Sequence, residues 1–451
     1  MPQTKHCFAG HSSNDFIYRD YKNEIYSNSE CNMCTKEHYL QEFGTWTSGN
    51  SDIDKVIQKS QSSLINRDRF TMNYNNSLQW IPYDDFYDIR HIADGGDGFI
   101  YSARLRKGLK WYWDLNKQDW KYWVYYRFAL KELKDSRYDL SEFLKKNIIV
   151  NDSDYINKCY GISKNPLTQN YIIVMNIYDY SLHHYLNCWD LRWETKIDLL
   201  LLISFGFDNL HRKNIVHGNL HSGNILIEII FGFKNVNTAQ ITDLGLCRLE
   251  NYLKSNHNSS NNNNQNNKIY GSIPYIPPEV LRGDAFTMKG DIYSFGGIMY
   301  EIITTQQPFV DQAHDTYLMI DICNGARPKV PDIILNWIPE WYLNLMYRCW
   351  SDDPSERPTA DELSNFFCEI SDKLYLNTVD NDIMRQLGIA DQNQEKAFKS
   401  QSELFPYPNK HPQSCYISRC IHTLHGLHDS LDDIESGKSS DPNLLKSNEL
   451  I

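Results

Sequence analysis

Two pairs of potential metal ligands lie near the amino terminus. Cys31 and Cys34 form a C-x2-C pair, and Cys7 and His11 precede them, with 19 residues between His11 and Cys31. Tetrahedral zinc needs four sulfur or imidazole ligands brought together by two tight turns, and two such pairs joined by a loop are typical of a small zinc ribbon. The first pair has the less usual spacing C-x3-H, and His6 is a competing donor. The sequence leaves two alternatives open, a structural zinc site at these residues and a segment with unliganded thiols.

A second group of polar residues follows a long apolar run in the middle of the chain. Residues 217–224 read HGNLHSGN, and residues 242–246 read TDLGL. This pattern resembles the catalytic loop of the protein kinases, H-R-D-L-x-x-x-N, followed by their metal-binding D-F-G. The resemblance implies that Asn224 and Asp243 hold magnesium. It also implies that Asn219 stands where the family has the aspartate that accepts the proton of the substrate hydroxyl.

Further motifs occur in the family's order along the chain. Residues 92–101, IADGGDGFIY, resemble the glycine-rich loop over the phosphates of ATP. The glycines are followed by a strand-like segment, FIYSARL, and this favours a kinase hairpin. Residues 128–131, FALK, resemble the strand that carries the phosphate-binding lysine, and residues 171–176, YIIVMN, resemble the strand that leads into the hinge. The resemblance implies that ATP is contacted by Ile92, Gly95, Gly96, Gly98, Ile100, Ala129, Lys131, Met175, Asn176 and Tyr178.

The carboxyl-terminal motifs indicate the remaining architecture. Residues 271–279, GSIPYIPPE, 291–296, DIYSFG, and 349–358, which begin CW and end RP, resemble conserved kinase segments. The resemblance implies that Asp291 holds the backbone of the catalytic loop and that Arg357 pairs with Glu279.

The implied fold is α+β, a bilobal protein kinase fold with a small β-rich N-lobe and a large helical C-lobe. We expect a leader over residues 1–79, a kinase domain over 80–373 and a polar, largely flexible tail over 374–451. Within the kinase domain the expected parts are the N-lobe 80–174, the hinge 175–179 and the C-lobe 180–373.

Two other parts of the sequence lie outside these motifs. A tryptophan-rich insertion at 109–126 separates two expected strands of the N-lobe. Residues 43–58 and 79–83 resemble the leader that precedes the kinase domain in an expanded fungal family of kinase-like proteins. Within that leader, Asn50 or Ser51 is suited to cap a helix that continues to Gln58. We also expect a buried helix over 193–210, because that stretch is apolar nearly all round.

The glycine-rich loop and the helix after Lys131 depart from the family pattern. Ala93 occupies the position of the first glycine, and Asp97 places a carboxylate where the loop would face a triphosphate. In kinases the phosphate-binding lysine pairs with a glutamate of the following helix. The usual spacing puts Lys146 in that position, whereas Glu142 would reach it after a shift of one turn, and the sequence leaves both alternatives open.

The catalytic loop carries two further departures. Gly218 replaces the arginine that usually receives an activation-loop phosphate, and an amide at Asn219 cannot accept a proton as a carboxylate does. We therefore interpret the chain as an ATP-binding pseudokinase, a regulator or scaffold in signalling. The alternatives are a weakly active kinase that phosphorylates Ser/Thr or Tyr of protein substrates, and an interaction module that needs no nucleotide.

Composition limits the partners and the compartment. The net charge of −12 disfavours nucleic acid and anionic membranes, which select basic surfaces. The polar start and the short apolar runs predict neither a secretory signal nor membrane insertion. The 11 cysteines, most of them isolated, suit a reducing compartment. We expect a soluble, cytoplasmic protein whose partners or substrates are proteins.

Overall fold

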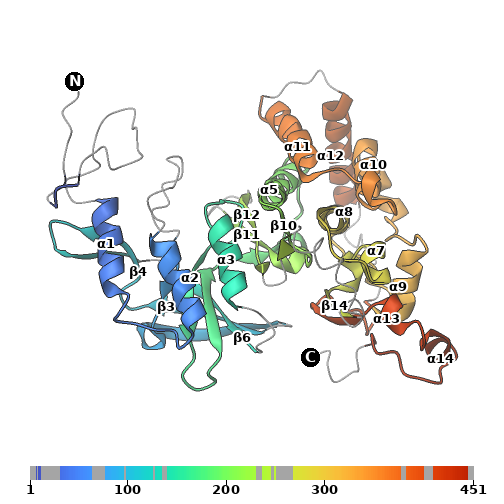
Figure 1. The fold of residues 1–451 in the computed structure, drawn as a ribbon. Helices are drawn as coiled ribbons and strands as arrows, with labels where there is room; N and C mark the ends of the chain where they lie inside the picture. The colour runs from blue at the N-terminus through green and yellow to red at the C-terminus, as the bar shows by residue number, and fades with distance from the viewer. Residues whose placement is uncertain are drawn as a thin grey trace. The chain divides into compact units, whose positions relative to one another are not determined.

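The computed structural model describes residues 7, 9–11, 31–62, 77–95, 98–124, 127–134, 140–229, 236–244, 248–249, 268–376, 382–400 and 410–444. The chain divides into two compact units (Figure 1). The N-terminal unit contains Met1–Ser153 and Asn157–Ile177, and the C-terminal unit contains Asp154–Ile156 and Tyr178–Ile451.

The N-terminal unit is built on a sheet with the strand order β1-β7-β8-β6-β3-β2. Its neighbouring strands are antiparallel except for the parallel pair β1 and β7. One face carries a cluster of buried apolar side chains that includes Phe128, Leu130 and Val174. The strands of the sheet are β1 (Gln79–Trp80), β2 (Phe86–Gly95), β3 (Gly98–Leu105), β6 (Phe128–Leu133), β7 (Cys159–Lys164) and β8 (Tyr171–Asn176), and the 3-10 turn η2 (Tyr83–Asp85) precedes β2.

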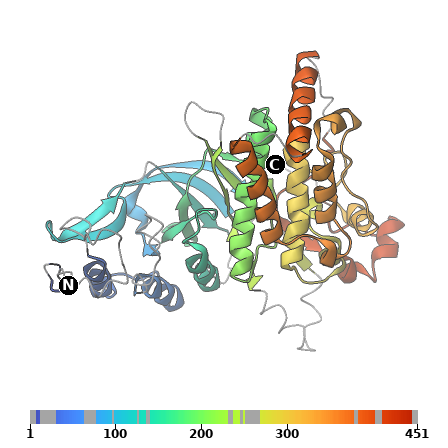
Figure 2. The ribbon, with the colours of Figure 1, turned by 90° about the horizontal axis from the view of Figure 1, so that it is seen from above.

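The tryptophan-rich insertion forms a separate antiparallel hairpin of β4 (Leu109–Asp114) and β5 (Asp119–Trp123). Three helices of this unit, α1 (Asn32–Glu42), α2 (Ser51–Ser62) and α3 (Leu140–Val150), lie side by side along one face of the sheet (Figure 2). The predicted cap of α2 is confirmed, because Asn50 Oδ1 accepts the backbone N–H of Asp52 at 2.9 Å.

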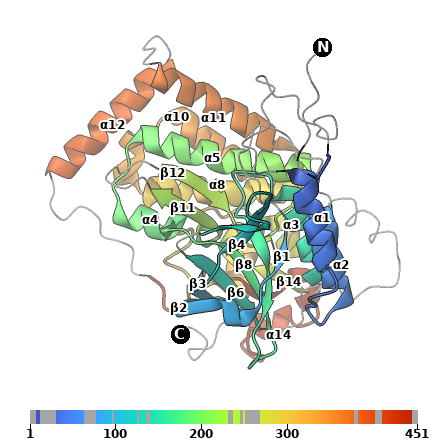
Figure 3. The same ribbon diagram turned by 90° about the vertical axis from the view of Figure 1, so that its left-hand side faces the viewer.

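The core of the C-terminal unit is helical. The predicted buried helix at 193–210 is confirmed as α5, which packs against α11 with α8 beside it (Figure 3). Edge-to-face and tilted ring contacts join these helices, with centroids 6.0 Å apart for Phe207 and Phe295 and 6.2 Å apart for Phe295 and Phe367. The helices are α4 (Leu182–Cys188), α5 (Trp193–Arg212), α7 (Pro278–Arg282), α8 (Met288–Thr304), α9 (Thr316–Cys323), α10 (Glu340–Cys349), α11 (Ala360–Tyr375), α12 (Asp382–Ser400), α13 (Leu424–Leu427) and α14 (Leu431–Glu435).

Short strands and 3-10 turns connect these helices. A small antiparallel sheet has the order β12-β11-β9, and two further pairs are β10 with β13 and β14 with β15. The strands are β9 (Tyr180–Ser181), β10 (Ile215–Val216), β11 (Ile225–Ile229), β12 (Val236–Ile241), β13 (Arg248–Leu249), β14 (Lys268–Gly271) and β15 (Arg419–His422). The 3-10 turns are η3 (Ser222–Asn224), η5 (Ile273–Tyr275), η6 (Asp332–Trp337) and η7 (Pro354–Glu356).

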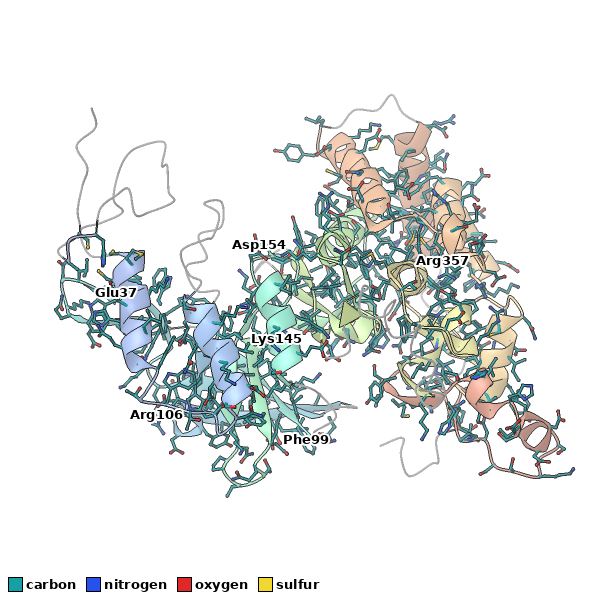
Figure 4. The ribbon with its side chains drawn as sticks, viewed as in Figure 1. Glu37, Phe99, Arg106, Lys145, Asp154 and Arg357 are labelled. Carbon is teal, nitrogen blue, oxygen red and sulfur yellow. The ribbon has the colours of Figure 1, made fainter. Side chains whose placement is uncertain are left out.

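A buried ion pair fixes the segment after β14 to the helical core. Arg357 Nη1 and Nη2 lie 2.7 and 2.8 Å from the two carboxylate oxygens of Glu279, and the arginine side chain has 0% exposure (Figure 4). The guanidinium also donates to the carbonyls of Ser351 and Lys289. The predicted pairing of Arg357 with Glu279 is therefore confirmed.

Arg357→Ala is expected to lower the free energy of unfolding of the chain by about 3–5 kcal/mol, because it leaves the largely buried Glu279 carboxylate, whose side chain is 14% exposed, without its partner. Chemical denaturation monitored by circular dichroism measures this loss. Arg348→Ala is the matched control, since Arg348 is half exposed and lies 3.9 Å from Glu362. A loss of equal size in both variants would contradict the role of the buried pair.

The residues after α11 differ from the flexible tail that composition predicts. Residues 382–400 form α12, in which Leu387 and Ala390 are buried and Asp391 accepts the backbone N–H of Trp193 at 3.0 Å. Residues 410–444 form β15, α13 and α14. Apolar residues spaced for one helix face are enough to dock a polar segment, and the polar composition concealed them.

Candidate functional site

The catalytic-loop residues are held in place by the buried carboxylate of Asp291. This carboxylate accepts the backbone N–H of His217 at 2.8 Å and that of Gly218 at 2.9 Å, and His211 Nε2 lies 3.0 Å from it. The predicted role of Asp291 is confirmed. Gly218 has φ 71, a left-handed conformation in which a residue with a Cβ is strained, so glycine is well suited to this point of the loop.

The residues expected to hold magnesium meet at one end of the hairpin of β11 and β12. The register pairs Ile225 with Ile241, and the backbone N–H of Thr242 donates to the carbonyl of Asn224 at 2.9 Å. Asn224 therefore lies directly before β11, and Asp243 lies shortly after β12, at the same end of the hairpin. An amide oxygen and a carboxylate are ligands that suit magnesium, so the pair fits the ion that the kinase fold implies. Asp243 has φ 65, an uncommon conformation for a residue other than glycine that often marks a functional position.

Asn219 lies between these residues and the carboxyl-terminal segment. Its backbone carbonyl accepts Asn224 Nδ2 at 2.9 Å, and its backbone N–H points to His217 Nδ1 at 3.3 Å. The side chain is buried, with Oδ1 accepting the hydroxyl of Ser418 at 2.7 Å. Asn219 Nδ2 has no hydrogen-bond partner among the residues that the structure describes.

His221 is a site residue that the sequence analysis missed. Its Nδ1 accepts the backbone N–H of Gly223 at 3.2 Å, so the proton resides on Nε2, which lies 3.1 Å from Ser418 Oγ. Burial lowers the pKa of His221 to about 4, and the ring is neutral at physiological pH. A chain of donors therefore runs from His221 to Ser418 to Asn219. In the sequence, His221 could have been noticed because it occupies the first variable position of the catalytic-loop motif, directly after Leu220.

In the N-terminal unit, four of the expected nucleotide contacts share one face of the sheet. Ile100 pairs with Lys131 across β3 and β6, and Ala129 pairs with Met175 across β6 and β8. Directly paired residues of an antiparallel sheet point to the same side, and residues two apart on β6 do so as well. This face lies opposite the cluster that contains Leu130.

The other expected nucleotide contacts lie on the glycine-rich hairpin and at the hinge. Gly95 and Gly98 pair at the hairpin end, where a Cβ on Gly98 would lie 2.1 Å from the Glu132 carbonyl, and Ile92 is half exposed on β2. The side chain of Asn176 accepts the Tyr160 hydroxyl at 2.6 Å.

In the C-terminal unit, the Tyr178 hydroxyl donates to Gln240. Gly96, Asp97 and Gly245 lie outside the described residues, as does the competing zinc donor His6.

On α3, Lys146 rather than Glu142 faces the interior. Lys146 is buried together with Phe143 and Asn147, whereas the Glu142 side chain is 49% exposed. The two side chains pair along the helix at 2.8 Å. The burial supports the register in which Lys146 occupies the position of the family's glutamate. A lysine at this position would repel the cation of Lys131 instead of pairing with it.

The predicted zinc ligands come together around the amino end of α1. The ligand atoms of Cys7, His11, Cys31 and Cys34 all lie within 4.8 Å of one another. His11 Nδ1 is 3.3–3.6 Å from the three sulfur atoms, and the sulfur atoms of Cys7 and Cys34 are 3.8 Å apart. With zinc about 2.3 Å from sulfur and about 2.0 Å from nitrogen, tetrahedral ligand atoms are separated by roughly 3.4–3.8 Å. The residues therefore fit a zinc ion.

A carboxylate orients the histidine of this cluster. His11 Nε2 lies 3.1 Å from Glu37 Oε1, which Figure 4 labels on α1 near the sulfur atoms. A histidine whose second nitrogen bonds a carboxylate has its ring and tautomer fixed, and this arrangement is common around metal ligands.

Helix α1 connects the cysteine cluster to the tryptophan-rich hairpin. Thr35 Oγ1 accepts the backbone N–H of Trp113 at 3.0 Å, and the rings of His38 and Trp113 stack with centroids 3.4 Å apart. Glu42 accepts Trp120 Nε1 at 2.7 Å and forms an ion pair with Lys110. The insertion is therefore the docking surface of the amino-terminal segment.

Comparison with known proteins identifies the family. The family described as protein tyrosine and serine/threonine kinase matches residues 90–367, more than half of the chain. The chain therefore belongs to the protein kinase family, as its motifs predict, and the family's binding of ATP and magnesium is implied for it. Its β-rich N-terminal and helical C-terminal regions confirm the predicted α+β class.

Several relatives have names that specify a kinase. The chain is 26% identical to the receptor-interacting serine/threonine-protein kinase 4 of Mus musculus over 64% of its own length and 34% of the relative's. It is 28% identical to a protein of Dictyostelium discoideum described as a probable serine/threonine-protein kinase, over 46% of this chain and 14% of the relative. It is 30% identical to a protein kinase and PP2C-like domain-containing protein of Arabidopsis thaliana, over 38% of this chain and 29% of the relative.

The chain thus spans about a third or less of the length of these three relatives. Among the described residues, no helix has the length and apolar character needed to cross a membrane.

Proposed function

We propose that this protein is a pseudokinase: it binds ATP and magnesium but transfers phosphate slowly or not at all, and it regulates or scaffolds protein partners in signalling. The observation that carries the proposal is Asn219. Its amide occupies the position of the proton-accepting aspartate and is bonded to a serine hydroxyl of the same chain. Loss of a general base typically reduces a rate by about 10² to 10⁴.

Two features support retained nucleotide binding. Asn224 and Asp243 meet at the hairpin end with the oxygen atoms that magnesium prefers, and Lys131 lies on a shared sheet face with Ile100. When bound, the magnesium ion neutralises phosphate charge. Lys131 would bind the α and β phosphates. On α3, the buried Lys146 pairs with Glu142 along the helix at 2.8 Å.

The same two features favour the second candidate, a slow but real protein kinase. Magnesium and the lysine supply electrostatic stabilisation and positioning, which contribute much of the rate of phosphoryl transfer. A third candidate, an interaction module without nucleotide, is favoured by the docking of α1 on the tryptophan-rich hairpin.

We also propose that Cys7, His11, Cys31 and Cys34 hold a structural zinc ion. Their separations match a tetrahedral site, and Glu37 orients the histidine. No catalytic role is assigned to this ion, because all four positions are taken by protein ligands.

Magnesium-ATP is expected to raise the melting temperature of the chain. At about 100 times the dissociation constant, binding adds about 2.7 kcal/mol to the stability of the folded state, or roughly 5–10 °C for a unit of this size. A thermal-shift titration measures the effect, and Lys131→Ala should remove most of it. Lys145→Ala is the matched control, since Lys145 is an exposed lysine on α3. No shift with any nucleotide would contradict the proposal and support the interaction module.

A further inference from the structure

The segment after α12 places a serine hydroxyl at the catalytic loop. Ser418 donates to Asn219 Oδ1 at 2.7 Å and lies 3.1 Å from His221 Nε2. In a protein kinase, the catalytic-loop aspartate accepts the proton of the substrate hydroxyl. Ser418 is therefore bonded to the side chain that would receive an acceptor serine of a substrate. It is 8% exposed, so solvent does not compete for this contact.

The residues after Ser418 continue as an added strand. Strand β15 pairs antiparallel with β14, which Figure 1 labels. The register runs from Arg419 opposite Gly271 to His422 opposite Lys268. Strand β14 leads directly into the segment that ends in Glu279. Backbone pairing of this kind is how an extended peptide adds to a sheet edge. Ile421 is the apolar anchor of the strand, with 0% exposure.

The residues before Ser418 are held by the loop between α8 and α9. Tyr416 donates to the carbonyl of Pro308 at 2.9 Å and packs edge-on against His314, with ring centroids 4.7 Å apart. Arg419 donates to the carbonyl of His314 at 2.6 Å. The segment is thus fixed on both sides of the serine.

The residues after β15 secure its far end. Asn443 is fully buried and bonds the backbone N–H and carbonyl of His422 at 2.8 and 2.9 Å. Asp441 accepts the backbone N–H and the hydroxyl of Thr316, at the start of α9, at 2.8 and 2.6 Å. These bonds make residues 410–444 a strap across the catalytic-loop face of the C-terminal unit.

We propose that residues 410–444 are an intramolecular substrate mimic, in which Ser418 occupies the acceptor position at Asn219 and β15 fills the peptide-binding edge of β14. The inference rests on the kinase fold and not on phosphoryl transfer. Displacement of the strap would expose a site for an extended protein segment that presents a serine to Asn219 and an apolar side chain three residues later, as Ser418 and Ile421 do.

The strap has the properties of a removable element. Its contacts around the serine are mainly hydrogen bonds and one short strand, and Ile417 and Cys420 are exposed. Elements with few buried apolar contacts open at lower free energy than the core.

The experiment measures binding of a fluorescein-labelled peptide of residues 410–424 to the full-length protein without nucleotide. Fluorescence anisotropy is compared for the wild type, Ile421→Asp and the matched control Ile417→Asp, whose isoleucine is 51% exposed. In the wild type, the tethered strap competes at an effective concentration of about 1 mM. We expect Ile421→Asp to bind the peptide at least about tenfold more tightly than the wild type and the control do.

Two further measurements make the result decisive. The amides of β14 should lose protection from hydrogen exchange in Ile421→Asp and keep it in Ile417→Asp. If Ile421→Asp unfolds the unit, Ser418→Glu provides the same comparison. Equal affinity of the wild type and the opened variant, or no binding to the opened variant, would overturn the proposal. Because no nucleotide is present, a failure here is separate from a failure of the pseudokinase proposal.

Discussion

The Asn219→Asp variant is expected to transfer the γ-phosphate of ATP about 10² to 10⁴ times faster than the wild-type chain. The replacement exchanges an amide for a carboxylate of the same shape, and the backbone of the residue stays bonded to Asn224 and His217. The amide nitrogen that is lost has no hydrogen-bond partner among the described residues, so no described contact is broken. The new carboxylate can accept the proton of a hydroxyl placed as Ser418 is.

Single-turnover transfer of radiolabelled phosphate measures this gain. Label is counted both on the chain itself and on added casein, since the strap places Ser418 against the reacting position. Adding Ser418→Ala shows how much of the label on the chain is at that serine. Asn187→Asp is the control for charge, because it makes the same exchange at an exposed residue of α4.

The wild-type rate decides between the two kinase readings. If the wild type transfers phosphate as fast as Asn219→Asp, and Lys131→Ala abolishes the transfer in both, the pseudokinase proposal is wrong and the chain is an active kinase. If Asn219→Asp remains inactive while Mg-ATP still raises the melting temperature, the base is not the only defect. The buried Lys146 would then be the next residue to replace, with glutamate, in the same background.

The sequence was informative where a motif combines a residue type with a fixed structural context. Asp291 could be assigned because its motif implies a carboxylate on a central helix, and Arg357 because its motif names the glutamate it pairs with. The clustering of the Cys and His side chains near the amino terminus was foreseeable because two close pairs of soft ligands limit the geometry. The predictions for Asp291 and Arg357 rested on the resemblance to the kinase family, whereas the cysteine and histidine cluster rested on the spacing of its two ligand pairs.

Contacts between distant, individually ordinary residues were not predictable. Ser418 is one serine in a polar segment, and it lies 199 positions from Asn219 in the sequence. Nothing in the local pattern indicates which loop it will meet, and its recognition depends on the strand pairing of β14 with β15. The polar composition suggested flexibility, whereas the contacts come from hydrogen bonds and a few buried residues such as Ile421 and Leu427.

The contact between the leader and the tryptophan-rich insertion was not predicted from the sequence either. In the structure, helix α1 of the leader packs against the hairpin of the insertion. Glu42 of α1 bonds both Lys110 and Trp120, one on each strand of the hairpin. A tryptophan-rich hairpin without this helix would leave large aromatic surfaces in water. The hairpin and the cysteine cluster therefore depend on each other, and loss of the metal should affect both.

Removal of zinc is expected to destabilise the N-terminal unit by at least about 3 kcal/mol, or roughly 6–12 °C in melting temperature. Without the ion, Cys7 and His11 lose the bonds that hold them to Cys31 and Cys34, and α1 loses the anchor at its amino end. The expected metal content is one zinc ion for each chain, measured by atomic emission spectroscopy. Cys34→Ser should release the ion, whereas Cys188→Ser, at an exposed cysteine of α4, should retain it.

Hydrogen exchange distinguishes a local role of the ion from general unfolding. After chelation, the amides of β4 and β5 should exchange faster, because the bond from Trp113 to Thr35 and that from Trp120 to Glu42 are lost with α1. The amides of β14 and β15, in the other unit, should keep their protection. Full zinc content in Cys34→Ser, or unchanged exchange of the hairpin after the metal is removed, would show that the ion does not hold the leader on the kinase domain.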